Sequence, residues 1–563
     1  MIVQQIKKDL TKVLKKLSIS AEKLSLEHPG QPDNGDYSTN IAMRIKKKAY
    51  PTPWDLANAI VNAWRSLGLP EYIAKIEVAK PGFINIWLKN ETLINKMGRV
   101  LKEKDKYGFV FGKDKKPIMV EYAQPNILKQ FHLGHLRNIC LGESISRFLE
   151  ASGHKIVRAN YQGDVGMHVA KCLWQIQQTR KALPKSLGER IKYLAKAYIK
   201  GNQAYTEKPD AKKEVEALNH KIYAQDPEIK ELWQQTRGWS LEYFDRIYQR
   251  LGVKFNRLYF EGEVADPGKK IVLQFLKKKV FARSEGAIIF PGEKYGLHNR
   301  VFVNQQGLPT YEAKDMALAK LQFKEFNPRQ IIHVVGSEQK GYFGVIFKAL
   351  KQINPKTANK EFHLVYGWVR LKAGKMASRI GQVVLAEWLL DEVKKRLTKA
   401  YKMNQKVAEE VTVGAVKYSL LKFNPSSEMV FDIDESINLE GDSGPYLQYT
   451  YARCQSVLKK AEKEAKGELA IKMELNEEEA ALLRTIYKFP EVVIEAGDNY
   501  APNLMTNFLF DLAQKYNLFY NRHRIIQAES EQLVDFRLAL TAVVAQVIKN
   551  GLYLLGIEAP ERM

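Results

Sequence analysis

Hydrophobic and polar residues follow three different patterns along the chain, and each pattern predicts a different kind of domain. In residues 1–108, apolar residues at helical spacing precede two runs of strand type, 73–79 and 83–88. We expect a small α/β domain there. Residues 405–563 keep helical spacing almost throughout, which predicts an all-α helix bundle. The central unit, residues 109–404, combines both patterns.

The central unit begins with a strand, a helix and a second strand in close succession. The apolar run 116–123 is typical of a buried strand, residues 136–152 are amphipathic and precede Gly153, and residues 154–161 are again of strand type. A helix between two strands at this spacing is a crossover that makes the strands parallel. The order therefore predicts an α/β domain built on a parallel sheet.

A charged and mostly helical stretch, residues 165–290, interrupts this alternation. Strand patterns return after it, at residues 299–304 and 330–338. We interpret the stretch as a helical insertion into the central domain.

The charge balance points to a polyanionic partner. The chain has 88 lysine and arginine residues against 63 aspartate and glutamate residues, a net charge of +25. An excess of this size is typical of proteins that bind nucleic acid, although a solvated basic surface would give the same balance.

Cysteine content and terminal sequence exclude several classes of protein. The three cysteines, Cys140, Cys172 and Cys454, are far apart in sequence, which excludes a disulfide scaffold and a cysteine-rich zinc module. Lys7 and Lys8 stand where a signal peptide needs an apolar run, and no apolar stretch reaches the length of a membrane span. We expect a cytoplasmic protein without membrane contact.

The strongest chemical motif is His132-Leu133-Gly134-His135, which follows the first predicted strand and opens the first predicted helix of the central unit. A helix N-terminus offers free N–H groups and a positive dipole end to phosphate. Gly134 permits close approach to the backbone, and the two imidazoles can donate to phosphate oxygens. A metal pair and two ordinary surface histidines are the competing interpretations.

A second motif is the basic segment 374–379, GKMASR, some 240 residues later. Lys375 and Arg379 on such a loop can close over a triphosphate and stabilise the charge that builds on leaving pyrophosphate. Taken alone, the segment is more typical of an exposed basic loop.

Together the two motifs resemble the HIGH and KMSKS pair of class I aminoacyl-tRNA synthetases, and EYAQPNILKQFHLGHLRN (121–138) resembles the arginyl-tRNA synthetase form of the first motif. Further segments are similar to that family in the family's order: NGDYSTNIAM (34–43), NYQGDVGMH (160–168), GLPTYEAKDMALA (307–319), HVVGSEQ (333–339), EGDSGPYLQYTYAR (440–453) and GLYLLGIEAPERM (551–563). The resemblance covers nearly the whole chain.

The resemblance implies a fold and a reaction. The fold would be a Rossmann-type catalytic domain between a small tRNA-binding domain and a helical anticodon-binding domain. The reaction would have two steps: arginine and ATP form arginyl-adenylate, and arginine then moves to the 3′-terminal ribose of tRNA(Arg). ATP would be a substrate and Mg²⁺ would accompany it, with no metal held by the protein itself. We expect a monomer.

The resemblance also assigns roles to individual residues. The ATP-binding and catalytic residues would be Lys129, His132, Gly134, His135, Lys375, Met376 and Arg379. The arginine-binding residues would be Glu121, Gln124, Asn126, His135, Tyr311, Asp315 and Gln339. The tRNA-binding residues would be Asn34, Tyr37, Tyr446 and Tyr449.

Elementary chemistry supports the arginine pocket, since a guanidinium needs carboxylate partners. Tyr311 and Asp315 are four residues apart, so they share a face of the predicted helix. The sequence departs from the family at Ser378, where the second lysine of KMSKS would stand, and the resemblance implies that Lys129 substitutes for it. Gln124 replaces a small residue.

Two other classes of protein remain open from the sequence. One is a small nucleotidyltransferase with an HxGH motif, which would need no tRNA. The other is a non-catalytic RNA-binding relative that kept the fold. Among the synthetases, the methionine, cysteine and large aliphatic members are alternatives to arginine.

Overall fold

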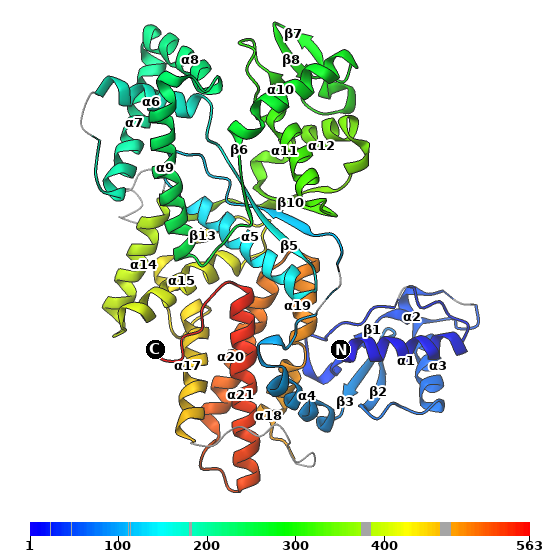
Figure 1. Ribbon diagram of the computed structural model, residues 1–563. Coiled ribbons are helices and arrows are strands. Elements are labelled where there is room, and N and C mark those ends of the chain that lie inside the picture. The colour runs from blue at the N-terminus through cyan, green and yellow to red at the C-terminus, as the bar shows by residue number, and fades with distance from the viewer. Residues whose placement is uncertain are drawn as a thin grey trace.

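The fold is described from a computed structural model, which covers residues 1–22, 24–46, 48–110, 112, 114–179, 183–372, 384–461 and 474–563. Figure 1 shows a small N-terminal domain beside the lower, helical half of the molecule, and a central sheet above that half with two lobes standing on it. Among the described helices, none has the length and apolar character needed to cross a bilayer.

The N-terminal domain is an antiparallel sheet covered by helices. Its strands β1 (Tyr37–Thr39), β2 (Ile73–Ala79) and β3 (Phe83–Leu88) take the order β1-β3-β2. Helix α1 (Ile2–Lys16) buries apolar residues spaced three or four apart, and α3 (Pro53–Ser66) begins with a capping box. The short helix α2 (Ile41–Arg44) lies between them in sequence. The two predicted strands are confirmed.

The predicted domain 1–108 does not stay together in space. Helix α4 (Asn90–Glu103) buries Leu93, Ile94, Met97 and Val100, and it packs against α18 (Glu477–Ile486) and α21 (Glu531–Leu554) of the C-terminal bundle. Sequence periodicity shows that a helix has an apolar face but not which domain covers that face.

The central domain contains the predicted parallel sheet. Five strands are paired in parallel in the order β11-β10-β4-β5-β6. Their bounds are β4 Ile118–Glu121, β5 Ile156–Gln162, β6 Arg257–Phe260, β10 Gln330–Gly336 and β11 Glu361–Tyr366. Helix α5 (Leu133–Ala151) makes the crossover from β4 to β5, as expected.

The insertion is shorter than predicted. Four helices form one of the two upper lobes: α6 Met167–Thr179, α7 Leu187–Glu207, α8 Pro209–Tyr223 and α9 Pro227–Arg250. The chain then returns to the central sheet as β6, so the expectation of one insertion over 165–290 is wrong at its C-terminal side. A strand of only four residues between two long helices carries too little pattern to be recognised.

The second upper lobe contains α10 (Glu261–Lys277), α11 (Tyr311–Phe326), α12 (Lys340–Ile353) and a small antiparallel sheet. That sheet has the order β7-β8-β9, with β7 Ala282–Ser284, β8 Ala287–Phe290 and β9 Arg300–Val303. The strand expected at 299–304 therefore exists, but it belongs to this sheet and not to the parallel one.

The predicted boundary at residue 405 also shifts. Strand β13 (Met429–Phe431) pairs in parallel with β12 (Val369–Leu371), so residues beyond 405 still belong to the central domain. The helices α14 (Ala386–Ala400), α15 (Gln405–Leu421) and α16 (Ile433–Ser436) accompany this pair. The remaining bundle helices are α17 Gly444–Lys460, α19 Phe489–Asp498 and α20 Asn503–Arg522.

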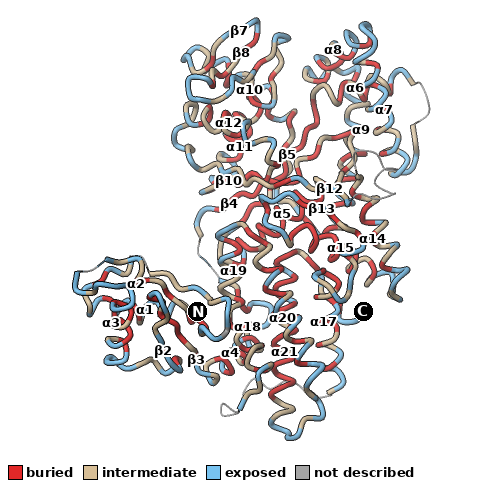
Figure 2. The backbone as a smooth tube through the Cα atoms, turned by 180° about the vertical axis from the view of Figure 1, so that it is seen from behind, coloured by how far each residue is buried: buried red, intermediate tan, exposed pale blue. Residues whose placement is uncertain are grey.

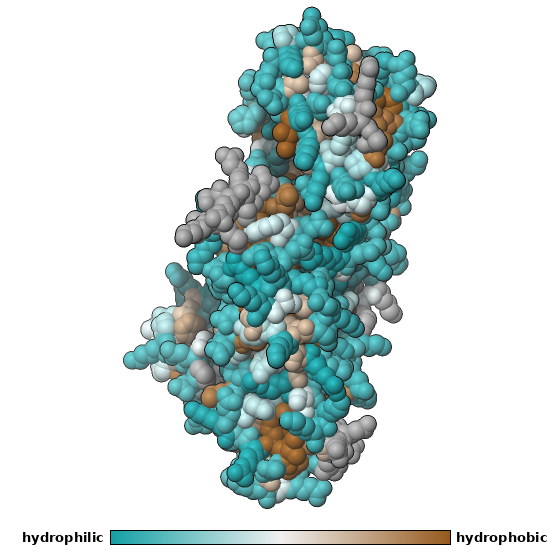
Figure 3. All heavy atoms as spheres, turned by 90° about the vertical axis from the view of Figure 1, so that its left-hand side faces the viewer, coloured by the Kyte–Doolittle hydropathy of each residue, from teal (hydrophilic) through white to brown (hydrophobic). Residues whose placement is uncertain are grey.

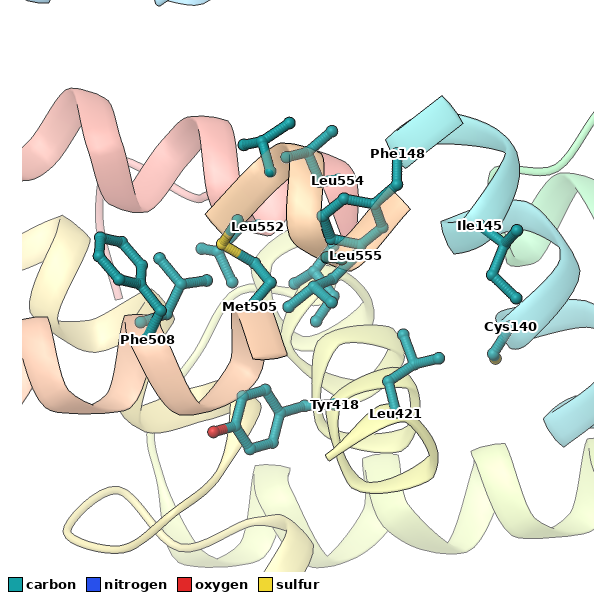
Figure 4. Packing of buried hydrophobic residues seen from close by; sticks show 14 of the residues in the cluster. Cys140, Ile145, Phe148, Tyr418, Leu421, Met505, Phe508, Leu552, Leu554 and Leu555 are labelled. Carbon is teal, nitrogen blue, oxygen red and sulfur yellow. The ribbon is translucent and has the colours of Figure 1, made fainter. Parts of the chain in front are cut away.

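Helix α5 joins the sheet to the bundle. Most of its residues are buried, because it packs against β4, β5 and β10 on one side and against α15, α19 and α21 on the other. Figure 4 shows Ile145 and Phe148 of α5 in one cluster with Tyr418, Met505 and Leu552 from the bundle side. Figure 2 shows this buried zone running through the centre of the molecule.

A polar junction fixes the N-terminal domain to the bundle. The buried Asp36 carboxylate accepts hydrogen bonds from Arg484 of α18, 2.9 Å to each oxygen. Tyr37 Oη donates to Glu491 Oε1 of α19 at 2.6 Å, and His28 Nε2 lies 3.1 Å from Glu491 Oε2. Direct side-chain pairs therefore determine how the two domains sit together.

Arg484→Ala should destabilise the full chain by about 1–3 kcal/mol, because the buried Asp36 carboxylate then keeps only its bond from the Leu88 N–H. Chemical unfolding of the purified protein measures the change. Arg99→Ala is the control, since its pair with Glu103 is solvent-exposed within α4, and it should cost about 0.5 kcal/mol or less. Equal stabilities for the two variants would contradict the assigned role of the junction.

Candidate active site

The site is a cavity of about 1040 Å³ at the carboxyl ends of the parallel strands. Residues that follow β4 and β10 line it, together with the start of α5 and of α11. Open parallel sheets bind ligands at this edge, because the loops after neighbouring strands leave in different directions and open a crevice. The cavity is large enough for an amino acid and a nucleotide side by side.

The chain leaves β4 through a strained turn held by two asparagines. Ala123 and Gln124 have φ values of 75° and 44°, in the left-handed region that non-glycine residues rarely adopt. The Asn138 side-chain oxygen accepts from the Ala123 N–H at 2.5 Å, and that of Asn160 accepts from the Gln124 N–H at 3.2 Å. Sequence reasoning did not identify either asparagine, since each acts through the backbone of another segment.

The two histidines of the HLGH motif form the start of α5. His132 is the N-cap, and its Nδ1 accepts from the Gly134 N–H at 3.1 Å. His135 Nδ1 accepts from the His132 N–H at 3.2 Å, and the ring centroids are 3.9 Å apart. Because both Nδ1 atoms accept, each neutral ring carries its proton on Nε2. The motif therefore builds the helix cap and presents two N–H donors.

Burial keeps both imidazoles neutral. It lowers the pKa of His135 to about 3, with further lowering by His132 and Lys129, and it lowers the pKa of His132 as well. Both residues line the cavity. They can thus stabilise negative charge by hydrogen bonding but not by a charge of their own.

The opposite part of the cavity is acidic. Glu121, at the end of β4, is buried and accepts hydrogen bonds from Gln322 Nε2 at 2.6 Å and Gln124 Nε2 at 3.1 Å. Asp315 of α11 accepts from Tyr342 Oη at 2.6 Å, and burial raises its pKa to about 8. These two carboxylates give the cavity its capacity for a cation.

The remaining predicted arginine-binding residues line the same cavity. Tyr311 is half exposed at the start of α11, Asn126 follows the β4 turn, and Gln339 ends the short helix Ser337–Gln339 after β10. A further acidic residue, Glu261, also lines the cavity, but its carboxylate is paired with the buried Lys314 ammonium at 2.5 Å. Sequence reasoning had not singled out Glu261 or Lys314.

The second motif lies outside the described residues, so Lys375, Met376, Ser378 and Arg379 are not placed. Leu371 and Val384, which lie close to the two ends of this segment, both line the cavity. Two backbone bonds attach the following chain to the first motif: Leu133 N–H to Val384 O and Ala386 N–H to Phe131 O, each 2.9 Å long.

Lys129 is half-buried beside the first motif but does not line the cavity. Its ammonium lies 4.8 Å from the ring centroid of Tyr198 in α7. It lowers the pKa of both motif histidines, so it contributes positive potential to this end of the site.

Of the predicted tRNA contacts, Tyr37 requires correction. Its side chain is buried in the junction with Glu491 and has no free ring face for RNA. Asn34 is exposed. Tyr446 is half-buried and bonded through Oη to Asn517, whereas Tyr449 is exposed with the Arg453 guanidinium 4.9 Å from its ring centroid.

Comparison with known proteins identifies the class. The family model for the catalytic domain of class I (R) tRNA synthetases matches residues 96–433. The models for the DALR anticodon-binding domain and the arginyl-tRNA synthetase N-terminal domain match residues 447–563 and 4–88.

The curated relatives include the arginine–tRNA ligase of Parabacteroides distasonis, 34% identical over 87% of this chain and 88% of that one, and that of Flavobacterium psychrophilum, 32% identical over 97% of each. The structure of Thermus thermophilus arginyl-tRNA synthetase superposes over the full length of both chains with a TM-score of 0.85 at 24% identity, which supports the fold.

The chain belongs to the arginyl-tRNA synthetase family. Its activity is that of an arginine–tRNA ligase, which forms arginyl-adenylate from arginine and ATP and then transfers arginine to tRNA. A nucleotidyltransferase and the other synthetase specificities are therefore no longer alternatives.

His135→Asn should separate the two roles of the motif. The Asn side-chain oxygen can replace Nδ1 as acceptor for the His132 N–H, so the helix start and the thermal stability should remain close to wild type. Loss of the Nε2 donor should slow adenylate formation by about 10²-fold. Arginine-dependent pyrophosphate exchange with tRNA present measures the rate.

The control for this variant is His154→Asn. His154 follows the other end of α5 and pairs with Asp114 at 2.7 Å, away from the cavity. It should leave the rate unchanged, and a wild-type rate for His135→Asn would remove the imidazole from the reaction.

Proposed function

We propose that the cavity binds arginine at its acidic part and ATP along the start of α5. The observation that carries this proposal is that two kinds of binding group lie in different parts of one cavity. Acidic side chains from β4 and α11 line one part, and neutral N–H donors at a helix N-terminus line another. In this arrangement the arginine carboxylate can approach the α-phosphorus of ATP.

Selection of arginine rests on Glu121, Asp315 and Tyr311. The Glu121 carboxylate attracts the cationic side chain, and Asp315 becomes a second carboxylate when arginine displaces its proton. The half-exposed Tyr311 ring offers an aromatic surface on which a planar guanidinium can lie. Gln124, Asn126 and Gln339 supply amide groups for the remaining polar atoms of the amino acid.

Charge stabilisation during adenylate formation rests on His132 and His135 at the helix start, with Gly134 giving room for the nucleotide. Lys129, Lys375 and Arg379 neutralise the β- and γ-phosphates, and Met376 lies in the same motif. The protein supplies positioning and electrostatics, because neither transfer step needs a covalent enzyme intermediate.

Mg²⁺ enters with ATP in this proposal. Within the part of the chain that the structure describes, no group of three or more His, Cys, Asp and Glu side chains is arranged to hold a metal ion. Phosphate oxygens and water are the ligands that Mg²⁺ prefers, so the nucleotide itself can carry the ion and supply its charge-neutralising chemistry.

The tRNA(Arg) partner would contact both outer domains. Asn34, Lys46 and Lys48 are exposed on the N-terminal domain, and Tyr449 is exposed on α17 of the bundle. Hydrophilic residues cover most of the face shown in Figure 3. We expect a monomer that acts in the cytoplasm.

Arginine binding should depend on pH through Asp315. With a pKa of about 8 the carboxyl group is protonated at neutral pH, so the arginine cation must displace a proton. The arginine KM should therefore fall as pH rises from 6 to 8, by up to about tenfold per unit, and level off above. Asp315→Asn should raise this KM and flatten its pH profile.

Kinetics of pyrophosphate exchange at saturating ATP measure the arginine KM, and the ATP KM of the same variant is the internal control. It should stay near wild type, because Asp315 lies in the acidic part of the cavity. A pH-independent arginine KM in the wild-type protein would show that Asp315 does not meet the substrate.

tRNA affinity should fall steeply with salt, since each neutralised phosphate releases counterions. The double variant Lys46→Ala, Lys48→Ala should weaken binding and reduce the salt slope by about one for each lysine that contacts phosphate. Lys270→Ala is the control, because that exposed ammonium is paired with Asp266 at 2.6 Å. An unchanged slope in the double variant would show that these lysines are only solvated.

A further inference from the structure

A buried histidine in the lining of the cavity connects two carboxylates on neighbouring strands. His333 lies in β10, between β4 and β11. Its Nδ1 is 3.1 Å from Glu121 Oε1, and its Nε2 is 2.6 Å from Glu361 Oε2. All three side chains are more than nine-tenths buried, with exposed fractions of 8%, 4% and 6%.

The two contacts favour charge on the ring. A carboxylate only accepts, so contacts to carboxylates at both nitrogens make both nitrogens donors, which is the imidazolium form. The neighbouring carboxylates accordingly raise the pKa of His333 well above its ordinary value, and they do so against the effect of burial. Its charge also lowers the pKa of Glu121.

Without this cation, two carboxylates would be buried on either side of one strand. Like charges in a low-dielectric interior disfavour double ionisation, so one carboxyl group would take up a proton. Glu121, at the end of β4, lines the cavity, and its ionisation depends on the charge of His333 beside it.

We infer that His333 is a positioning residue of the arginine site, which holds the Glu121 carboxylate in one orientation and in the charged form that attracts the arginine side chain. The inference rests on the proposed function, because it takes Glu121 to contact arginine. Gln322 and Gln124 complete the arrangement, since they donate to Glu121 but bring no charge.

Other titratable groups face His333 from each packed element. Glu121 approaches from β4, Glu361 and His363 from β11, and Asp315 from α11. Helix α12 places the rings of Phe343 and Phe347 beside it, 5.3 Å and 6.2 Å away between centroids, and its Tyr342 hydroxyl bonds to Asp315. The cation thus has three acidic neighbours. Among the described residues, His333 is the one positively charged group that bonds to Glu121.

A purely structural role is the competing explanation, in which His333 only attaches β11 to the sheet. Two substitutions distinguish the roles, because Asn and Gln place an amide N–H near the positions of Nδ1 and Nε2 respectively. His333→Asn can keep the bond to Glu121, and His333→Gln can keep the bond to Glu361.

The experiment compares the arginine KM and ATP KM of both variants in pyrophosphate exchange with tRNA present. We expect His333→Gln to raise the arginine KM at least tenfold at pH 7 with the ATP KM within about twofold, and the defect to shrink as pH rises and Glu121 ionises. His333→Asn should raise the arginine KM less than His333→Gln at the same pH. Equal arginine KM values for wild type and His333→Gln, or a pH-independent defect, would overturn the inference.

The matched control is His363→Gln. His363 is the register partner of His333 on β11 and bonds to the Val335 carbonyl at 3.0 Å, but it does not line the cavity. It should leave the arginine KM unchanged at each pH. A KM defect as large as that of His333→Gln would favour the structural role and overturn the inference.

Glu121→Gln separates this inference from the proposed function. If it leaves the arginine KM unchanged, the assignment of Glu121 to arginine fails and the inference fails with it. If it raises the KM while His333→Gln does not, only the positioning role fails.

The wild-type chain provides a test that needs no variant. In full-length protein labelled with ¹⁵N-histidine, the His333 ring should show both nitrogens protonated at pH 7. A neutral ring at that pH would overturn the inference.

Discussion

Helix α5 is buried along most of its length, and this burial holds the catalytic domain and the bundle together. Its body is enclosed by the parallel sheet and the C-terminal bundle, so polar groups at both of its ends need partners from other elements or from its own caps. At the N-terminus the motif histidines provide the cap and open into the cavity. Farther along, Ser144 and Arg147 donate to carbonyls at the end of α21, 3.0 Å and 2.8 Å away. One helix thus connects the site to the anticodon-binding domain.

The same burial sets the electrostatics of the site. Burial raises the pKa of Asp315 to about 8 and lowers the pKa of His135 to about 3. Both shifts favour the neutral form of the side chain near pH 7. Glu121 is the exception, because His333 compensates for its desolvation. Arginine and ATP would bring charges that the donors and acceptors of the cavity stabilise.

The N-terminal domain shows how a motif can be placed in the right domain with the wrong role. Within NGDYS, Asp36 and Tyr37 serve the junction with α18 and α19, whereas Asn34 stays exposed. A tyrosine in a turn-rich segment is as suitable for RNA as for an interdomain bond, and only the partner element decides. Removal of residues 1–108 would break the side-chain pairs at this junction and would also take α4 from the bundle. Substitution of single charged residues is therefore a cleaner test of tRNA contacts.

The sequence by itself determined the parallel sheet, the helix after the first motif, and the residues at the strand ends, because period and order are local properties that strands and helices express wherever they pack. It also determined the family, through motifs read in order. Only the tertiary structure decided that α4 belongs to the bundle, that β6 and β13 return to the central domain, and that Asn138, Asn160 and His333 serve the site. These assignments depend on contacts between residues far apart in the chain, and the two carboxylates that favour the charged form of His333 lie beside it only once three strands are paired.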